Sequence, residues 1–351
     1  MSASVPKRLF SGIAKLPASL DPFPALAKPL TAEPLAPDDT PTTTMSSTLT
    51  DSSANPTQAT RLAVSIGGFS FGLWCSAGMP VALDPEHQPF LLRATSNDGC
   101  HFELDIAWTD SLQLPKLIPS FSSGGLWSAF VSETGTKFYF SSIAVSPLPY
   151  KAAWFDPSFQ RGHIVLNRSV FPQHAPVFPL EYPLDELAMM HRLALGEGVE
   201  VHALGLADAD GSGYLFLGHS GAGKSTTARL WMEQPGVTLL SDDRIILRQH
   251  DGKFWMYGTP WHGDAGVASP ACVPLDSVFL LEQALVNEVT PVAPARAAAE
   301  LFARSFVPHY LQSGIQFSLD FLDQLTRSVP CSVLRFTPTP GAVEAVRYAR
   351  V

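Results

Sequence analysis

Short runs of apolar, aromatic and β-branched residues dominate residues 61–182, and Gly, Pro, Asn and Asp separate one run from the next. Runs of this length and composition are typical of β-strands that end in turns. The segment HFELDIA alternates apolar and polar residues, as a strand with one buried face does. The pattern therefore predicts a mostly antiparallel β domain over 61–182, and nothing in it indicates catalysis.

The pattern changes after residue 182. Residues 183–195 repeat apolar side chains at helical spacing, which predicts a helix that connects two domains. Strand and helix patterns then alternate to the end of the chain. They include VEVHALGLA as one strand, a hairpin that turns at Asp251-Gly252, and helices near 295–306 and 317–328. We therefore predict an α/β domain over 183–351.

Residues 1–60 are rich in Pro, Ser, Thr and Ala, and they hold nine of the 31 prolines. Such a composition cannot bury much apolar surface, so we predict a disordered tail. It is interpreted as a passive extension, with a docking or regulatory role as the alternative. Translation from Met45 would remove most of it.

Composition narrows the classes of partner. The 351 residues are 46% hydrophobic and carry a net charge of −9. A nucleic-acid binder more often shows a basic face. Lys224 and Lys253 are the only two lysines between residues 196 and 351, so no nucleic-acid partner is predicted. The longest uncharged stretch, 62–83, is broken by four glycines and Pro80, which favours strands and turns over a membrane span.

The four cysteines lie far apart and form no CxxC pair. This spacing indicates neither a zinc site of the usual kind nor a disulfide framework. A reducing cytoplasm fits it, and we predict a cytoplasmic protein.

One motif indicates nucleotide binding. Residues 218–225 match the P-loop, or Walker A, pattern G-x-x-x-x-G-K-[ST] without a mismatch, between a strand pattern and a helix pattern. In such a loop the backbone N–H groups and the helix N-terminus face phosphate oxygens. Lys224 can reach the β- and γ-phosphates, and the Ser225 hydroxyl can bind Mg²⁺. The predicted cofactors are ATP and Mg²⁺, and the predicted binding residues are Gly218, His219, Ser220, Gly221, Ala222, Gly223, Lys224, Ser225 and Thr226.

A second motif ends the apolar segment LLS with Asp242 and Asp243, 18 and 19 residues after Lys224. Taken alone, two such residues are typical of a turn that opens the following hairpin. Beside a P-loop, one carboxylate can hold Mg²⁺ and the other can accept a proton from an attacking hydroxyl. We predict both as catalytic, with Asp242 as a metal ligand together with Ser225, and leave the division of roles open.

The motifs GHSGAGKST and LLSDDRIIL, with VHALGL before them, resemble those of the HPr serine kinase/phosphorylase family, which shares its P-loop fold with phosphoenolpyruvate carboxykinase. The continuation GTPWHG, VPLDSVFLLEQ and VPCSVLRF is similar to HPr-kinase-related proteins encoded beside peptide-modification genes. Some of these phosphorylate a serine of a ribosomally made peptide such as a lasso peptide. The resemblance covers about 183–351 and extends more weakly to 61–182.

The resemblance adds site residues. It implies that His202, which precedes the P-loop strand, lies near the reacting phosphate, although a single histidine in a strand is more often structural. It implies a weaker phosphate or substrate contact for His262, whose alternative is a turn residue. Arg244 and Arg304 could supply transition-state charge, and ordinary salt bridges are the alternative for both.

The resemblance also sets the expected function. The chain lacks the glycine-rich signature that follows the Asp pair in the bifunctional enzymes, so neither phosphorylase activity nor HPr as substrate is expected. The predicted fold is a carboxykinase-like mixed sheet with helices, after a mostly β domain. The predicted activity is transfer of the γ-phosphate of ATP to a serine of a peptide or small protein. A small-molecule kinase and a nucleotide-binding regulator with little turnover are the alternatives, and related kinases form homo-oligomers.

Overall fold

The structure is a computed structural model, and it describes residues 60–92, 100–142, 146–171 and 175–349. All of them belong to one compact unit, Thr57–Val351. The predicted tail, Thr60 aside, and the question of Met45 lie outside the described residues. The division into a domain over 61–182 and another over 183–351 stays a prediction.

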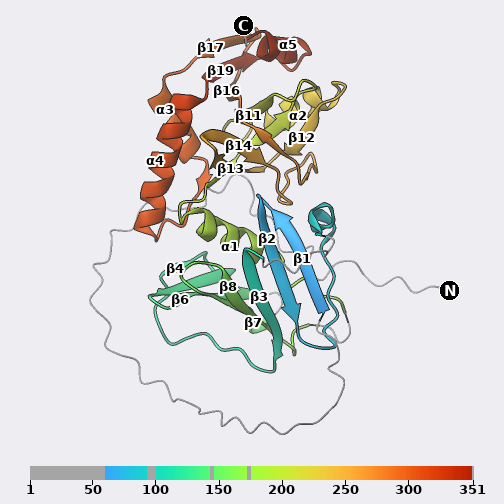
Figure 1. Cartoon of the computed structure of the whole chain (residues 1–351), viewed down its shortest axis with the longest axis vertical. Coiled ribbons are helices and arrows are strands. Elements are labelled where there is room, and N and C mark those ends of the chain that lie inside the picture. The colour runs from blue at the N-terminus through green and yellow to red at the C-terminus, as the bar shows by residue number, and fades with distance from the viewer. Residues whose placement is uncertain (1–59, 93–99, 143–145, 172–174, 350–351) are drawn as a thin grey trace, which may run out of the picture. The chain divides into compact units, whose positions relative to one another are not determined.

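The first part of the described chain forms an eight-stranded sheet (Figure 1). Five of its neighbouring pairs are antiparallel, and β3 runs parallel to both β2 and β8. The 3-10 helix η1 (Pro85–Phe90) follows β2. The strands, in sheet order, are β1 (Thr60–Ile66), β2 (Phe69–Cys75), β3 (Phe102–Thr109), β8 (Arg161–Asn167), β7 (Ser146–Phe155), β6 (Gly135–Ser142), β5 (Trp127–Ser132) and β4 (Phe121–Ser122).

A six-stranded sheet carries the glycine-rich motif at the carboxyl end of β11, the shortest of its three parallel strands. β11, β16 and β19 are parallel neighbours, whereas the other pairs are antiparallel. The strands, in sheet order, are β12 (Thr238–Ser241), β10 (Leu204–Ala207), β11 (Gly213–Leu217), β16 (Ser277–Gln283), β19 (Cys331–Phe336) and β17 (Glu288–Pro291).

A third, five-stranded sheet is antiparallel throughout. Its central hairpin turns at Asp251 and Gly252, whose φ angles of 51° and 74° are those of the predicted two-residue turn. The strands, in sheet order, are β15 (Cys272–Pro274), β14 (Lys253–Tyr257), β13 (Arg244–His250), β9 (Val199–His202) and β18 (Ser305–Phe306).

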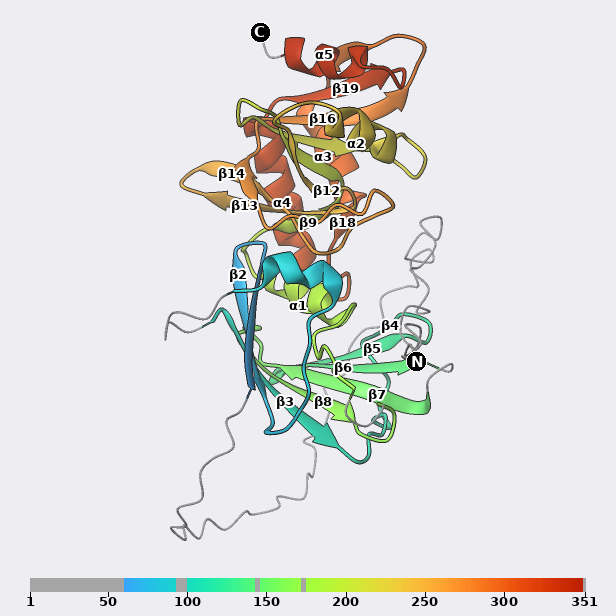
Figure 2. The same ribbon diagram turned by 90° about the vertical axis from the view of Figure 1, so that its right-hand side faces the viewer.

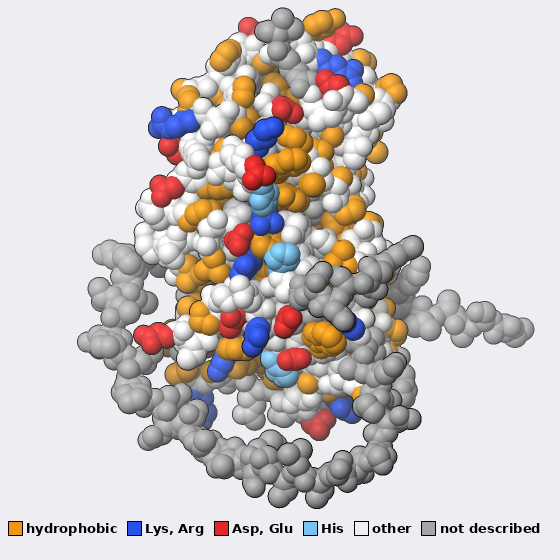
Figure 3. Space-filling view, in the orientation of Figure 1, with side chains coloured by type: hydrophobic (Ala, Val, Ile, Leu, Met, Phe, Trp, Pro, Cys, Tyr) orange, Lys and Arg blue, Asp and Glu red, His pale blue; other side chains and the backbone are white. Residues whose placement is uncertain are grey.

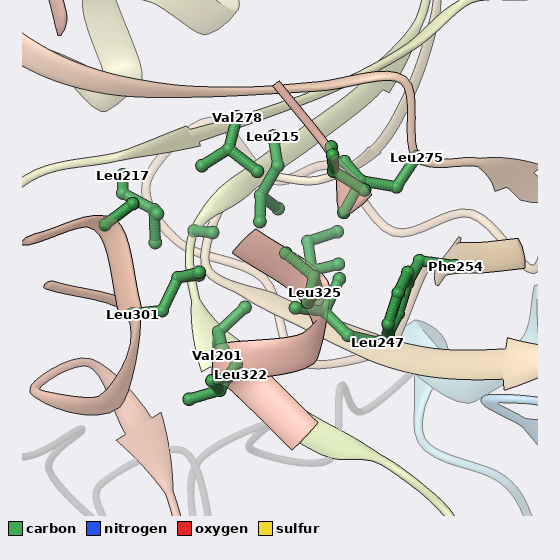
Figure 4. Close-up of a cluster of buried hydrophobic side chains, with 14 of the residues drawn as sticks. Val201, Leu215, Leu217, Leu247, Phe254, Leu275, Val278, Leu301, Leu322 and Leu325 are labelled. Carbon is green, nitrogen blue, oxygen red and sulfur yellow. The ribbon is translucent and has the colours of Figure 1, made fainter. Parts of the chain in front are cut away.

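Helices cover both faces of the six-stranded sheet. Along β11, Leu215 and Leu217 pack into one apolar cluster with α3 and α4, part of which Figure 4 shows. Tyr214 and Phe216 point to the opposite face and pack with α2 and α5. This two-residue alternation leaves the whole strand buried, which explains why YLFL is continuously apolar. The helices are α1 (Leu184–Leu193), α2 (Lys224–Met232), α3 (Pro294–Phe302), α4 (Gln312–Ser328) and α5 (Gly341–Tyr348), and α3 and α4 run side by side (Figure 2).

The prediction of a mixed α/β fold is confirmed at the level of three sheets with a few helices. Two local predictions were wrong. The segment VEVHALGLA is two strands in different sheets, because β9 pairs with β13 whereas β10 pairs with β11 and β12. The helix predicted over 295–306 ends at Phe302, because Ser305 and Phe306 pair with β9 as β18.

None of the described helices is both long enough and apolar enough to span a membrane. The uncharged stretch 62–83 instead forms β1 and β2, as predicted. Between them Gly67 and Gly68 make a turn with φ angles of 60° and 78°.

Candidate functional site

The loop of residues 218–223 joins the buried end of β11 to the first turn of α2. Gly221 and Gly223 have φ angles of 80° and 111°, which few residues other than glycine adopt. A Cβ on Gly223 would also lie 2.6 Å from Cζ of Phe336. The loop leaves His219, Ser220 and Gly221 exposed, and Ser225 and Thr226 are partly exposed in the first turn of α2. These features fit a loop whose backbone amides receive phosphate oxygens.

Lys224 is nine-tenths buried at the start of α2. Its Nζ donates a hydrogen bond to the carbonyl oxygen of Gly218, at 2.9 Å, across the base of the loop. Burial lowers the pKa of Lys224, and the positive charges of Arg304 and Arg244 lower it further, while Asp243 opposes them. Burial deprives the ammonium group of water, and a phosphate bound by the loop would supply the negative charge and hydrogen-bond acceptors that it lacks.

Two crossings of the chain between sheets lie next to each other beside this loop. Ala203 carries the chain from β9 to β10, and Asp242 and Asp243 carry it from β12 to β13. The N–H of Ala203 donates to the carbonyl oxygen of Asp243 at 3.1 Å, and Arg244 is the register partner of His202. Segments about 40 residues apart in sequence therefore place their polar side chains at one point.

The crossings bring His202 and Asp243 into a pair. Nε2 of His202 lies 3.0 Å from Oδ1 of Asp243, and Nη1 of Arg244 donates to Oδ2 of Asp243 at 2.7 Å. Burial would raise the pKa of Asp243, but the hydrogen bond with His202 and the positive charges of Arg244 and Lys224 outweigh it and lower the pKa to about 2. Asp243 is thus an ionised carboxylate at neutral pH, and 28% of its side chain is exposed.

Asp242 points elsewhere. Its two carboxylate oxygens accept hydrogen bonds from the backbone N–H groups of Gly263 and Ala265, at 2.9 and 2.8 Å, and the residue is buried. It therefore holds the segment 263–265 that follows β14. The weaker candidate His262 precedes this segment, with Nδ1 3.0 Å from the carbonyl oxygen of Gly263.

Arg244 is surrounded by carboxylates that the sequence did not indicate as site residues. Besides Asp243, its Nε lies 2.8 Å from Glu186 and 3.5 Å from Glu200, and its guanidinium stacks 4.0 Å from the ring centroid of Phe306. Glu200 is fully buried. Burial, followed by the negative charge of Glu186, raises its pKa well above the usual value despite Arg244.

The first turn of α1 supports both aspartates. Glu186 binds Arg244, which binds Asp243. The preceding Asp185 is fully buried, and its Oδ2 accepts a 2.6 Å hydrogen bond from Nε1 of Trp261, on the segment that leads to Gly263.

The same oxygen of Asp185 lies 2.9 Å from Nε2 of His87, in η1. Two adjacent acidic residues thus connect α1 to the surroundings of Asp242 and of Asp243. In the sequence, Asp185 and Glu186 are acidic residues at the start of a predicted helix, which is a common pattern. That pattern does not indicate their distant partners.

Arg304 follows α3 and lies at the other side of His202. Its carbonyl oxygen accepts the N–H of His202 at 2.7 Å, and its Nη1 lies 2.5 Å from Glu300. Both arginines that the resemblance suggested are thus salt-bridged, and both lie close enough to Lys224 to lower its pKa.

The structure brings some of the predicted site residues together and leaves Asp242 apart. The side chains of His202 and Asp243 meet, and Lys224 lies within electrostatic range of Asp243, whereas Asp242 faces the 263–265 segment. No cluster of three or more His, Cys, Asp or Glu side chains able to hold a metal ion occurs within the described part of the chain. A Mg²⁺ ion that completes its shell with phosphate oxygens and water needs fewer protein ligands, and the Ser225 hydroxyl and the Asp243 carboxylate have the chemistry it prefers.

Comparison with known proteins finds a distant structural similarity. No family model matches the chain, and no curated protein matches it. Among solved structures it is similar to the Hpr(Ser) kinase/phosphatase from Coxiella burnetii, with 16% sequence identity and a TM-score of 0.26. The match covers 43% of this chain and 90% of that one.

Proposed function

We propose that this chain is an ATP- and Mg²⁺-dependent kinase that transfers the γ-phosphate to a serine hydroxyl of a peptide or small protein. The observation that carries the proposal is the placement of a complete P-loop motif between β11 and α2, with Lys224 close to the His202–Asp243 pair. A phosphate-binding loop alone fits any nucleotide-binding protein. A carboxylate–histidine pair beside it adds a group that can accept a proton.

The bound magnesium nucleotide would supply the transferable phosphoryl group and the metal charge that stabilises it. The amides of residues 219–225 and the N-terminus of α2 bind phosphate oxygens in this proposal. Lys224 exchanges its hydrogen bond with Gly218 for a phosphate oxygen and neutralises part of its charge. Ser225 is the residue that would hold the metal directly, and Asp243 would hold it through a water molecule.

Proton acceptance falls to the His202–Asp243 pair rather than to Asp242. Arg244 occupies Oδ2 of Asp243 and Nε2–H of His202 donates to Oδ1, 3.0 Å away, so the proton of the acceptor hydroxyl passes to the remaining lone pair of Oδ1 while His202 holds the carboxylate in place. With a pKa of about 2, Asp243 is a weak base, so it accepts the proton late, as the bond to phosphorus makes the hydroxyl acidic. Both oxygens of Asp242 already bind backbone N–H groups, so we assign Asp242 a positioning role.

The class of acceptor rests on the sequence resemblance to HPr-kinase-related proteins of peptide-modification gene clusters. Transfer of label from γ-labelled ATP, with Mg²⁺, to serine-containing peptides, HPr and free serine tests it. Wild type is compared with Lys224→Ala and Asp243→Asn. The matched controls are Lys253→Ala and Asp251→Asn, at exposed positions of the β13–β14 hairpin.

Label on a peptide that both site variants lose and both controls keep is the expected result. Label on free serine would replace the peptide acceptor with a small molecule. Binding of ATP without transfer to any acceptor, and with no turnover above Lys224→Ala, would contradict a kinase and favour a regulator.

A further inference from the structure

A pocket of about 530 Å³ opens beside the phosphate loop. Gly218, His219, Gly221 and Ala222 form one wall, and the last residues of β16 together with the α3 region form the others. It lies at the carboxyl ends of the parallel neighbours β11 and β16. In sheets of this kind ligands bind outside the carboxyl ends of parallel strands, so the position is that of a ligand site.

A hydrogen bond joins the phosphate loop to the β16 wall of this pocket. Nε2 of Gln283, at the end of β16, donates a 2.7 Å hydrogen bond to the carbonyl oxygen of Gly221. A ligand in the pocket and phosphates on the loop would thus contact the same short segment.

The charges that line the pocket cancel. Arg296 is paired with Glu282 at 3.1 Å, and Arg304 with Glu300 at 2.5 Å. Figure 3 shows the same mixture of signs on the face it displays, where basic, acidic and histidine side chains alternate down the middle. A pocket whose arginines are already neutralised offers little to a second anion and suits an uncharged group that forms hydrogen bonds.

The proton-accepting pair lies outside this pocket. His202, Asp243 and Lys224 do not line it, whereas Arg304 belongs to both regions: it lines the pocket, and its carbonyl oxygen accepts the N–H of His202. The phosphate loop therefore has a charge-neutral pocket beside Gly218–Ala222, and the His202–Asp243 dyad lies on the other side, near Lys224.

We propose that the pocket is the nucleoside subsite and that the acceptor hydroxyl approaches from the dyad side. The nucleoside is the neutral, hydrogen-bonding part of a nucleotide, and its size suits a cavity of this volume. The inference rests on the proposed function, because it requires that the loop binds the triphosphate. It further specifies that base and ribose occupy the β16–α3 side.

The test separates nucleoside binding from phosphate binding. Dissociation constants of ATP and of inorganic tripolyphosphate, each with Mg²⁺, are measured by calorimetry for wild type and for Arg296→Trp, whose ring fills the pocket from an exposed position on α3. Glu282 keeps Arg335 as a second partner, at 3.3 Å, in that variant. Arg327→Trp, on the exposed face of α4, removes the same charge elsewhere and is the matched control.

Wild type is expected to bind ATP at least about tenfold more tightly than tripolyphosphate. Arg296→Trp should remove that advantage and leave tripolyphosphate unchanged, and Arg327→Trp should change neither. Arg296→Ala removes the charge without filling the space, so it should keep the affinity for ATP.

Equal affinity of wild type for ATP and tripolyphosphate would overturn the nucleoside subsite while leaving the loop intact. So would an Arg296→Trp variant that weakens both ligands equally or neither, or an Arg296→Ala variant that loses ATP as Arg296→Trp does. Absence of binding of either ligand to wild type would instead overturn the proposed function.

Discussion

Nε1 of Trp261 donates a 2.6 Å hydrogen bond to Oδ2 of Asp185, a carboxylate with no solvent exposure. The bond ties the first turn of α1 to the segment whose backbone holds Asp242. The same oxygen of Asp185 also lies 2.9 Å from Nε2 of His87 in η1. This one carboxylate therefore links α1, η1 and the segment that contains Trp261.

Removal of the indole donor of Trp261 should therefore lower the free energy of unfolding. Trp261→Phe leaves a buried carboxylate oxygen with one partner fewer, which we expect to cost about 1–3 kcal/mol in free energy of unfolding. Urea denaturation measures it. Trp74→Phe, at a position 41% exposed, is the control and should stay within about 0.5 kcal/mol of wild type. Equal stabilities of Trp261→Phe and wild type would show that the bond contributes nothing.

The ionised state of Asp243 should stabilise the fold at neutral pH. Its folded-state pKa of about 2 lies below the ordinary 3.8, so its contribution is present above pH 3.8 and is lost as the pH falls toward 2. We expect Asp243→Asn to be about 2 kcal/mol less stable than wild type at pH 7, and the gap to shrink by about half at pH 3. Urea unfolding at both pH values checks this, and a gap that does not change with pH contradicts it.

Glu200 should show the opposite dependence. Its pKa is raised above the usual 4.5, first by burial and then by Glu186, so the folded protein holds a proton that the unfolded chain releases. Stability from this group is present below pH 4.5 and is lost as the pH rises toward the folded-state pKa. Glu200→Gln keeps the shape without the titration.

Across pH 5 to 8 the variant should therefore gain stability relative to wild type as the pH rises. Chemical denaturation at several pH values measures the difference. Glu133→Gln, at an exposed turn, supplies the baseline. If the difference between Glu200→Gln and wild type is the same at every pH, Glu200 does not hold a proton.

The two loop glycines should respond differently to alanine. In Gly223→Ala the new Cβ meets Phe336 at a backbone φ of 111°, so we expect loss of ATP binding together with a destabilisation of about 2–3 kcal/mol. In Gly221→Ala the Cβ enters open space, and only the φ of 80° is unfavourable, at about 1 kcal/mol. Calorimetric titration with ATP and thermal unfolding compare them, and equal effects would contradict the role of Phe336.

The parts of the site that are contiguous in sequence could be predicted. The phosphate loop depends on eight consecutive residues between a strand and a helix, and α2 begins at Lys224 as expected. Asp243 follows a short buried strand, so its position near the loop was also within reach of the sequence.

The remaining parts depend on pairing between distant segments. Nothing in the apolar alternation of VEVHALGLA marks Ala203 as the break, because the break exists only through the separate partners of β9 and β10. Strand β7 carries Pro147 and Pro149, a residue type that is rare inside paired strands, yet it pairs with both β6 and β8. Asp185 and Glu186 find their partners 58 to 98 residues away, a separation over which a single sequence gives no pairing signal.

The adjacent crossings at Ala203 and at Asp242–Asp243 give the dyad a mechanical property. His202 ends β9 and Asp243 directly precedes β13, and these two strands are paired neighbours in the five-stranded sheet. The pairing of Arg244 with His202 therefore fixes the spacing of the dyad within one sheet. The phosphate loop follows β11 of the six-stranded sheet, so a rotation of one sheet against the other would move the intact dyad relative to the loop. The distance between the proton acceptor and the phosphates would change, whereas the distance between Nε2 and Oδ1 would not.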